Sequence, residues 1–195
     1  MLNLKLAAAA VGVLLCAACS KPRKQQPEPR PAFSYRSLND TEVRYLKPFL
    51  LDFDEDNQLE IFFFVGVLID DEGTHARFGA AGWELCKLLS RPDSLLRLNE
   101  GDEIPVLPRH PNEWNGLAYL CKLLLPAANP QDSTWTGAWL PGGKKFMGVQ
   151  FQTGEDTFMG WVSLSVDTAR DCMILHDCAW RRVEAGTVRA GKRSD

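Results

Sequence analysis

The residues most able to do chemistry lie in the stretch LLDFDEDNQLEIFFF, residues 50–64. Every second residue from 52 to 60 has an oxygen-bearing side chain, and these residues are Asp52, Asp54, Asp56, Gln58 and Glu60. Ca²⁺ takes six to eight oxygen ligands, and alternation turns every second side chain toward the same side. The spacing therefore predicts a calcium site formed by the Asp carboxylates, the Gln58 backbone carbonyl and Glu60. The alternative is a solvated acidic turn whose carboxylates only accept hydrogen bonds from backbone N–H groups.

An EF-hand is excluded, because loop position 12 is Phe63 instead of the bidentate Glu. No helical pattern flanks the loop either. Asn57 stands where calcium loops usually have Gly, and Asn tolerates the left-handed conformation better than most residues. The spacing resembles the calcium loops between strands of secreted β-propeller repeats, in which an acid at position 9, here Glu60, closes the ligand shell. Such a site would bind Ca²⁺ in the submillimolar to millimolar range.

No catalytic residue is predicted. The chain has three histidines, His75, His110 and His176, but no G-x-S-x-G elbow and no cysteine-protease motif. The net charge of −3 offers no basic surface for nucleic acid. Three tryptophans in loop-like segments, Trp114, Trp135 and Trp139, are either core plugs or platforms for sugars and partner proteins.

Four cysteines fall within the folded part of the chain: Cys86, Cys121, Cys172 and Cys178. Export to an oxidising compartment would allow two disulfides, and four buried free thiols are the alternative. On one extended strand Cys172 and Cys178 would lie ~20 Å apart and face the same side, so each would pair with Cys86 or Cys121. No C-x-x-C pair supports a zinc site.

The N-terminus predicts export. Lys5 precedes a short apolar run, which is too short to span a bilayer and suits a signal peptide of residues 1–18. The run ends in CAAC, and small residues before Cys19 resemble the bacterial lipobox. That resemblance implies a diacylated, palmitate-bearing Cys19 at the mature N-terminus. Residues 19–32 are rich in proline and charge and predict a tether, with the membrane as a partner through the lipid.

Residues 33–184 predict one all-β domain, a mostly antiparallel β-sandwich with at most one or two short helices. Residues 60–69 and the segment THARFGA read as a hairpin around Gly73. KFMGVQFQT, TFMGWVSLSV and CMILHDCAWRRV read as a three-stranded meander joined by short turns. AAGWELCKLLS and NGLAYLCKLLLP fit either short helices or strands. Residues 185–195 predict a flexible basic tail.

The order of these features is familiar. FMGVQFQTGEDTFMGWVSLSV and ILHDCAW resemble the C-terminal signature "yiG-v-x-F … yGW-v-x-l-x-V … i-x-D-y-A-y/w" of exported bacterial β-sandwich proteins of unassigned function. The match is best over residues 145–180. Met159 and Cys178 stand where the signature has Tyr. The resemblance implies a secreted or surface β domain and supplies no catalytic residues.

Together these observations predict a lipid-anchored lipoprotein of the bacterial cell envelope, in the inner or the outer membrane. Its expected role is that of a non-catalytic binding or structural domain, with an envelope glycan or protein as partner. An envelope hydrolase acting on glycans is the alternative. A cleft gathering two acids, or a hydroxyl nucleophile beside His176, would favour the hydrolase, whereas scattered histidines would count against it.

Overall fold

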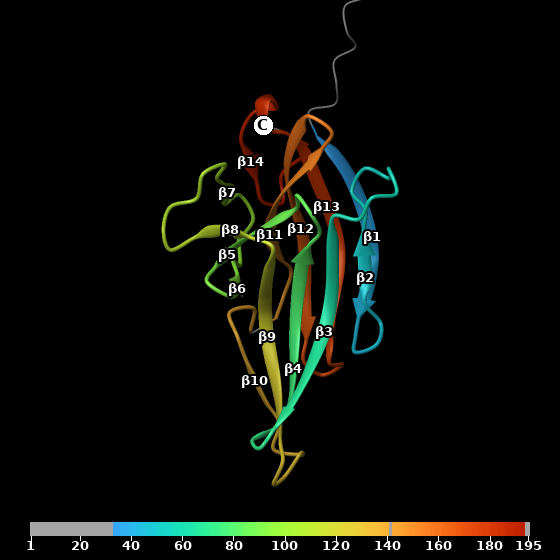
Figure 1. The fold of residues 1–195 in the computed structure, drawn as a ribbon, viewed down its shortest axis with the longest axis vertical. Coiled ribbons are helices and arrows are strands. Elements are labelled where there is room, and N and C mark those ends of the chain that lie inside the picture. Colours follow the sequence, from blue (N-terminus) through green and yellow to red (C-terminus); the bar gives the residue numbers. More distant parts are fainter. Residues whose placement is uncertain (1–32, 141, 194–195) are drawn as a thin grey trace, which may run out of the picture. The chain divides into compact units, whose positions relative to one another are not determined.

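The computed structural model describes residues 33–140 and 142–193, and the predicted signal peptide, Cys19 and the tether lie outside these residues. The described chain is built almost entirely of strands (Figure 1). The strands are β1 (Ser34–Val43), β2 (Phe49–Leu51), β3 (Ile61–Asp70), β4 (Gly73–Gly82), β5 (Lys87–Arg91), β6 (Ser94–Leu95), β7 (Glu103–Ile104), β8 (Glu113–Asn115), β9 (Leu117–Pro126), β10 (Thr134–Thr136), β11 (Lys145–Thr153), β12 (Asp156–Asp167), β13 (Cys172–Arg182) and β14 (Val188–Arg189). A single 3₁₀ turn, η1 (Val183–Ala185), is the one helical element of the described residues.

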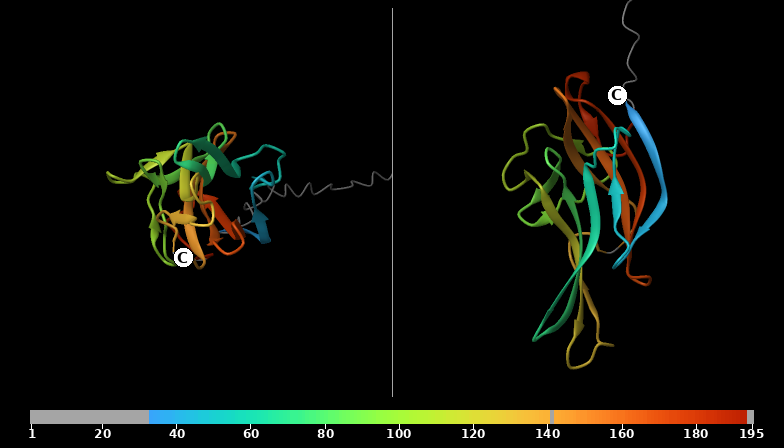
Figure 2. Two further views of the ribbon diagram at one scale, coloured as in Figure 1. Left: turned by 90° about the horizontal axis from the view of Figure 1, so that it is seen from below. Right: turned by 45° about the vertical axis from the view of Figure 1, so that its right-hand side comes forward.

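Twelve strands form one sheet in the order β1-β13-β12-β11-β5-β6-β9-β4-β3-β2, with β10 added to β9 and β8 added to β5. All pairings are antiparallel except the short contact between β6 and β9. The sheet turns over at β5 and β6, so that one layer of β11, β12, β13 and β1 faces a second layer of β9, β4, β3 and β2. Figure 2 (right) shows β3 and β4 standing apart from β13 and β1. The all-β, sandwich-like fold predicted from the sequence is confirmed.

The main core fills the space between the two layers. Alternation on β11 and β12 directs every second side chain into it, as the sequence predicts: Met147, Val149, Phe151, Phe158, Val162, Leu164 and Val166. The facing layer supplies Phe63, Phe78 and Leu120. Phe53 is 1% exposed and stacks on Phe151 with ring centroids 4.8 Å apart. Aromatic pairs of this kind add to the free energy gained from the buried area.

A second, smaller core covers the opposite face of β11–β13. Its members are Leu89, Leu98, Ile104, Phe146, Met159, Trp161, Ala179, Val188 and Ala190. The C-terminal residues provide part of this cover, because β14 pairs with β7 and the indole N–H of Trp161 donates to the Lys192 carbonyl at 3.0 Å. The prediction of a flexible tail over residues 185–195 is therefore wrong for residues up to Arg193. Small buried side chains such as Val188 and Ala190 leave no periodic signal in so short a segment.

The hairpin, the meander and the two segments that fitted either helix or strand all form strands. β3 and β4 form the expected hairpin around Gly73, and β11, β12 and β13 form the expected meander. The second LCKLL segment, residues 120–124, lies within β9, and residues 87–89 of the first segment lie in β5 after a turn that holds residues 85–86. Neither segment is helical. Their shared letters do not make a repeat, because β5 is a short central strand and β9 is a long one.

An irregularity interrupts the last strand of the meander. Ser163 lies opposite Asp177 and Leu164 lies opposite Leu175, so His176 is an extra residue without a partner on β12. On the other side of β13, Ser37 pairs with Asp177 and Thr41 with Leu175, so β1 also carries extra residues, 38–40. A bulge of this kind reverses which residues face the core.

The packed tail predicts a stability effect. Removing residues 187–195 would expose the second core and leave the Trp161 indole N–H without its carbonyl partner. We expect a loss on the order of 3 kcal/mol in the free energy of unfolding, from lost apolar burial and one hydrogen bond. Urea denaturation of this chain and of a control lacking only Ser194 and Asp195 measures the loss. Equal midpoints for the two chains would contradict the packed tail.

Candidate metal centre

The acidic loop spans residues 52–60 and joins β2 to β3 at one end of the main core. Its ends are closed by a hydrogen bond from the Glu60 N–H to the Leu51 carbonyl, 3.0 Å long. Phe53 anchors the start of the loop, because its ring packs against Phe151 and Trp180. Phe53 thus points into the core, while Asp54, Glu55 and Asp56 stay at the surface.

Hydrogen bonds within the loop set its curvature. The Asp52 carboxylate accepts the N–H groups of Glu55 at 2.7 Å and Asn57 at 2.8 Å. Glu55 and Asn57 both have a left-handed backbone, with φ of 62° and 69°. The prediction that Asn57 takes the place of glycine in this conformation is confirmed. The solvated-turn alternative is met in part, because Asp52 and Asp56 cap backbone N–H groups.

The turn also brings acids together. One carboxylate oxygen from each of four residues lies within 4.8 Å of the other three, and these residues are Asp52, Asp54, Asp56 and Glu60. Gln58 directs its side-chain amide to Asp56 Oδ2 at 3.1 Å, which leaves its backbone carbonyl as the oxygen predicted for a ligand. Clustered carboxylate oxygens on a strand-to-strand loop are the ligand type that hard cations prefer. The structure therefore brings together the four carboxylates that the sequence predicts.

Glu60 is the unusual member, because its side chain is buried and only 7% of the residue is exposed. Burial, together with the negative charges of Asp54, Asp52 and Asp56, raises its pKa from 4.5 to about 7, although a hydrogen bond from the Phe53 N–H at 2.6 Å acts in the opposite direction. A buried carboxylate beside three others needs a proton or a cation to offset its charge. The proton or cation that offsets the charge of the acids therefore also acts on Glu60 at the buried end of the loop.

A cavity of about 380 Å³ opens beside the loop. Its wall includes Glu60, Cys86 and Phe151 together with two exposed apolar residues, Trp83 and Leu85. The Trp83 N–H donates to the Glu60 carbonyl at 2.8 Å, which fixes the tryptophan segment to the acidic loop. The sequence prediction missed Trp83. Trp83 could have been noticed because it directly follows Gly82 in a turn. An aromatic side chain there does not belong to the apolar face of a strand.

The tryptophans chosen from the sequence are packing residues. Trp139 is buried, with its indole N–H bonded to the Leu95 carbonyl at 3.0 Å. Trp135 and Trp114 are half-buried against the main core and the second core, respectively. Of the two interpretations, core plugs therefore apply to all three.

The four cysteines of the described chain are free and buried, so the predicted disulfides are absent and the free-thiol alternative applies. Cys172 and Cys178 do not face the same side as predicted, because the bulge in β13 lies between them: Cys178 faces the main core, while Cys172 lies outside both cores. Burial raises the pKa of the Cys121 and Cys178 thiols to about 12, which keeps them protonated and unreactive.

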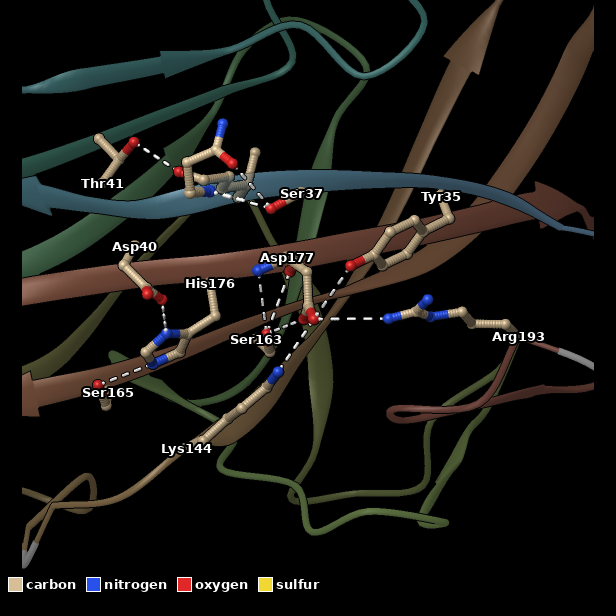
Figure 3. A network of polar contacts seen from close by, with 12 residues as sticks. Tyr35, Ser37, Asp40, Thr41, Lys144, Ser163, Ser165, His176, Asp177 and Arg193 are labelled. Atoms are coloured by element: carbon tan, nitrogen blue, oxygen red, sulfur yellow. Dashed lines mark hydrogen bonds and ion pairs between the residues drawn. The ribbon is translucent and has the colours of Figure 1, made fainter.

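The histidines lie in three separate places. His110 is exposed in a loop, and His75 is buried at the β3–β4 hairpin with its Nε2 2.8 Å from Asp70 Oδ1. His176, in the bulge of β13, contacts Ser165 and Asp40 (Figure 3). A hydroxyl beside His176, the arrangement expected to favour a hydrolase, is present in Ser165, whereas the separation of the three histidines counts against one. The contacts with Asp40 and Asp70 were not predicted from the sequence.

A second group of metal-ligand side chains was also missed: Asp70, Glu72 and His75 have ligand atoms within 4.8 Å of one another. The hydrogen bond from His75 lowers the pKa of Asp70. Asp70 also accepts the backbone N–H of Glu72 at 3.0 Å, so this carboxylate closes the hairpin. The run DDEGTH contains the signal, which reads first as an ordinary turn.

The raised pKa of Glu60 predicts a pH dependence of stability. A carboxyl group with a higher pKa in the folded state stabilises that state while protonated. Its contribution is complete below the unfolded value of 4.5 and is lost as the pH rises through about 7. In chelator, we therefore expect the free energy of unfolding to fall less over this window in Glu60→Gln than in the wild type. Urea titrations across the window measure the difference.

Glu84→Gln is the matched control, because Glu84 lines the same cavity and is exposed. It should keep the wild-type pH dependence. A Glu60→Gln protein that also kept it would show that Glu60 does not titrate in this window.

Comparison with known proteins adds no relative: no protein-family profile, curated protein or solved structure matches this chain. Within the described residues, no helix has the length and apolar character needed to cross a membrane. The function must therefore be argued from the geometry of the described residues.

Proposed function

We propose that this chain is a lipoprotein of the bacterial cell envelope, anchored through Cys19, and that the end of its β domain that carries the acidic loop is a non-catalytic binding site. In this proposal a calcium ion holds the acidic loop, and the adjoining cavity receives an envelope glycan or protein. The observation that carries it is the convergence of four carboxylates next to a cavity lined by exposed apolar side chains.

Calcium suits the loop for electrostatic reasons. Asp54 and Asp56 are exposed and Asp52 is half-buried, but Glu60 is buried against them and its pKa is raised to about 7. A divalent cation would replace the proton on Glu60 and offset the mutual repulsion of the acids. The hydrogen bond from the Thr153 hydroxyl to Asp54 Oδ2, 3.0 Å long, would link that ion to the end of β11.

The cavity suits a ligand with both polar and apolar surface. Trp83 is 61% exposed and Leu85 is 57% exposed, although large apolar side chains are usually covered. Aromatic side chains with this exposure recur at binding sites because they bury a large area on contact. Because Trp83 is bonded to the Glu60 carbonyl, ordering of the loop by calcium would also order this wall of the cavity.

Glycoside hydrolysis, the alternative, receives less support from the same acids. Glycosidases hold their two carboxyl groups about 5–9.5 Å apart so that a sugar bond fits between them. In the acidic loop the ligand oxygens lie within 4.8 Å of one another, which suits a cation. Asp52 is further occupied by two backbone N–H groups.

Thermal unfolding of the full chain with and without calcium tests the metal. Calcium at ten times its dissociation constant would stabilise the folded state by ~1.4 kcal/mol. For a domain of this size the melting temperature should rise by about 3–6 °C. The rise should disappear in Asp54→Ala, which removes a ligand that bonds no backbone N–H group of the loop.

Glu184→Gln is the control, because Glu184 is an exposed acid in η1, outside the acidic loop. It should retain the calcium response. Identical melts in calcium and in chelator would remove the metal from the proposal, while leaving the lipid anchor untouched.

The anchor has its own test. Cys19→Ala should abolish incorporation of labelled palmitate and release the protein from the membrane fraction, since stable anchoring needs more than one acyl chain. Cys16→Ala is the matched control and should label normally, because the bulky Leu15 before Cys16 does not suit the lipobox. Continued labelling of Cys19→Ala would rule out lipidation at this residue.

A further inference from the structure

The outer face of β12 changes character along the strand. Met159 and Trp161 lie under the second core, whereas Ser163 and Ser165 follow on the same face. The C-terminal cover reaches Arg193, whose guanidinium lies 3.7 Å from Asp177 Oδ2. Ser165 lies further along the strand and is only partly buried. The C-terminal residues therefore do not fully cover the polar end of this face.

Two backbone irregularities meet at this polar end. His176 is the extra residue in β13, and residues 38–40 are the extra residues in β1. Asn39 and Asp40 both have φ of 52°, a left-handed conformation that Asn and Asp adopt more readily than other residues. Bulges occur often beside active sites because they redirect a side chain out of the regular alternation. Here they bring His176 and Asp40 together from neighbouring strands.

The redirected side chains form a chain of contacts (Figure 3). His176 Nε2 lies 2.9 Å from the Ser165 hydroxyl oxygen. On the other side of the ring, His176 Nδ1 lies 2.5 Å from Asp40 Oδ1. The order hydroxyl, Nε2, Nδ1, carboxylate is the arrangement in which an imidazole accepts a serine proton and a carboxylate orients the ring. Three strands contribute one residue each, so no sequence motif reveals the arrangement.

We propose that Ser165 is the nucleophile of an acyl-transfer site that acts on carboxylic esters, with His176 as general base and Asp40 as the positioning residue. The Ser165 oxygen attacks the ester carbonyl carbon, and its proton passes to His176 Nε2. The bond to the alcohol then breaks, and the alcohol leaves with that proton. Water next adds to the acyl group, giving its proton to His176, and the carboxylic acid leaves as Ser165 regains the proton.

The neighbourhood of Ser165 leaves room for an ester. The residues before β11 run alongside the end of β12, because Lys145 pairs with Leu164. Gly142 approaches the Val166 carbonyl there, and a side chain added to Gly143 would meet no atom within 4 Å.

The neighbouring serine provides an internal contrast. Ser163 is fully buried, and its hydroxyl bonds the Asp177 carboxylate, which also accepts Lys144 Nζ at 3.0 Å. These contacts lower the pKa of Asp177 against the effect of its burial. Ser163 has no imidazole partner, so we assign it a structural role. Ser165 differs from it in both exposure and partner.

A fluorophosphonate reagent tests the nucleophile directly on the full chain. In labelling, the Ser165 oxygen bonds to phosphorus, fluoride leaves and the proton passes to His176. We expect one adduct, mapped to Ser165 by peptide mass spectrometry, together with hydrolysis of p-nitrophenyl acetate. Both should be lost in Ser165→Ala and slowed at least ~100-fold in His176→Asn, since a general base contributes a factor of this size.

The role of Asp40 is tested by a measurement that would not change if the residue only supported the fold. Asp40→Asn should slow labelling at least ~10-fold, and Asp40→Glu, which keeps the carboxylate, should restore part of the rate. Ser133→Ala, in the exposed turn before β10, is the control and should label like the wild type.

Circular dichroism melts identify any variant that does not fold, and the wild-type adduct map does not depend on the variants. Absence of an adduct at Ser165 in the wild type would overturn the proposal. So would an unchanged labelling rate in a folded His176→Asn protein. Either result would leave the calcium response of the acidic loop unaffected, because that loop lies between β2 and β3.

Discussion

Burial of both faces of β12 governs the layout of the domain. Its alternate residues enter two different cores, so neither layer of the sandwich can shift along the strand without exposing apolar surface. The main core needs the opposite layer to cover it, and the second core needs the C-terminal residues. The acidic loop depends on this arrangement, since Phe53 is anchored in the main core. The polar end of β12 also depends on it, since Ser165 lies just beyond the part of the strand that the second core covers.

Most of the fold follows from alternation and turn residues. The hairpin around Gly73 and the meander of β11, β12 and β13 are readable because each strand has one consistently apolar face. Prediction from alternation fails where the alternation itself is interrupted. The bulge at His176 places Cys172 and Cys178 on different faces, which a regular strand would put on the same face. The packing of the C-terminal residues was not predicted for another reason. Two small residues, Val188 and Ala190, and the Lys192 carbonyl hold them against the second core.

The two sites differ in how much the sequence reveals. The acids of the loop are close in sequence, so their spacing predicts their convergence in space. The burial of Glu60 and the cavity at Trp83 could not be predicted, because the wall of the cavity comes from the turn between β4 and β5 and from the end of β11. The contacts among Ser165, His176 and Asp40 were even harder to predict from the sequence. Their meeting requires three strands in one register and two bulges, none of which a single sequence displays.

The two ends of the folded domain meet at one place. The Arg193 guanidinium lies 3.4 Å from the centroid of the Tyr35 ring, and Tyr35 stands near the start of β1. Domains whose ends are adjacent tolerate circular permutation and insertion into the loops of other proteins. New ends could therefore be opened at an exposed turn such as residues 154–155 while a short linker joins Arg193 to the start of β1. The sandwich would then be a module that can be carried by a host chain at both ends.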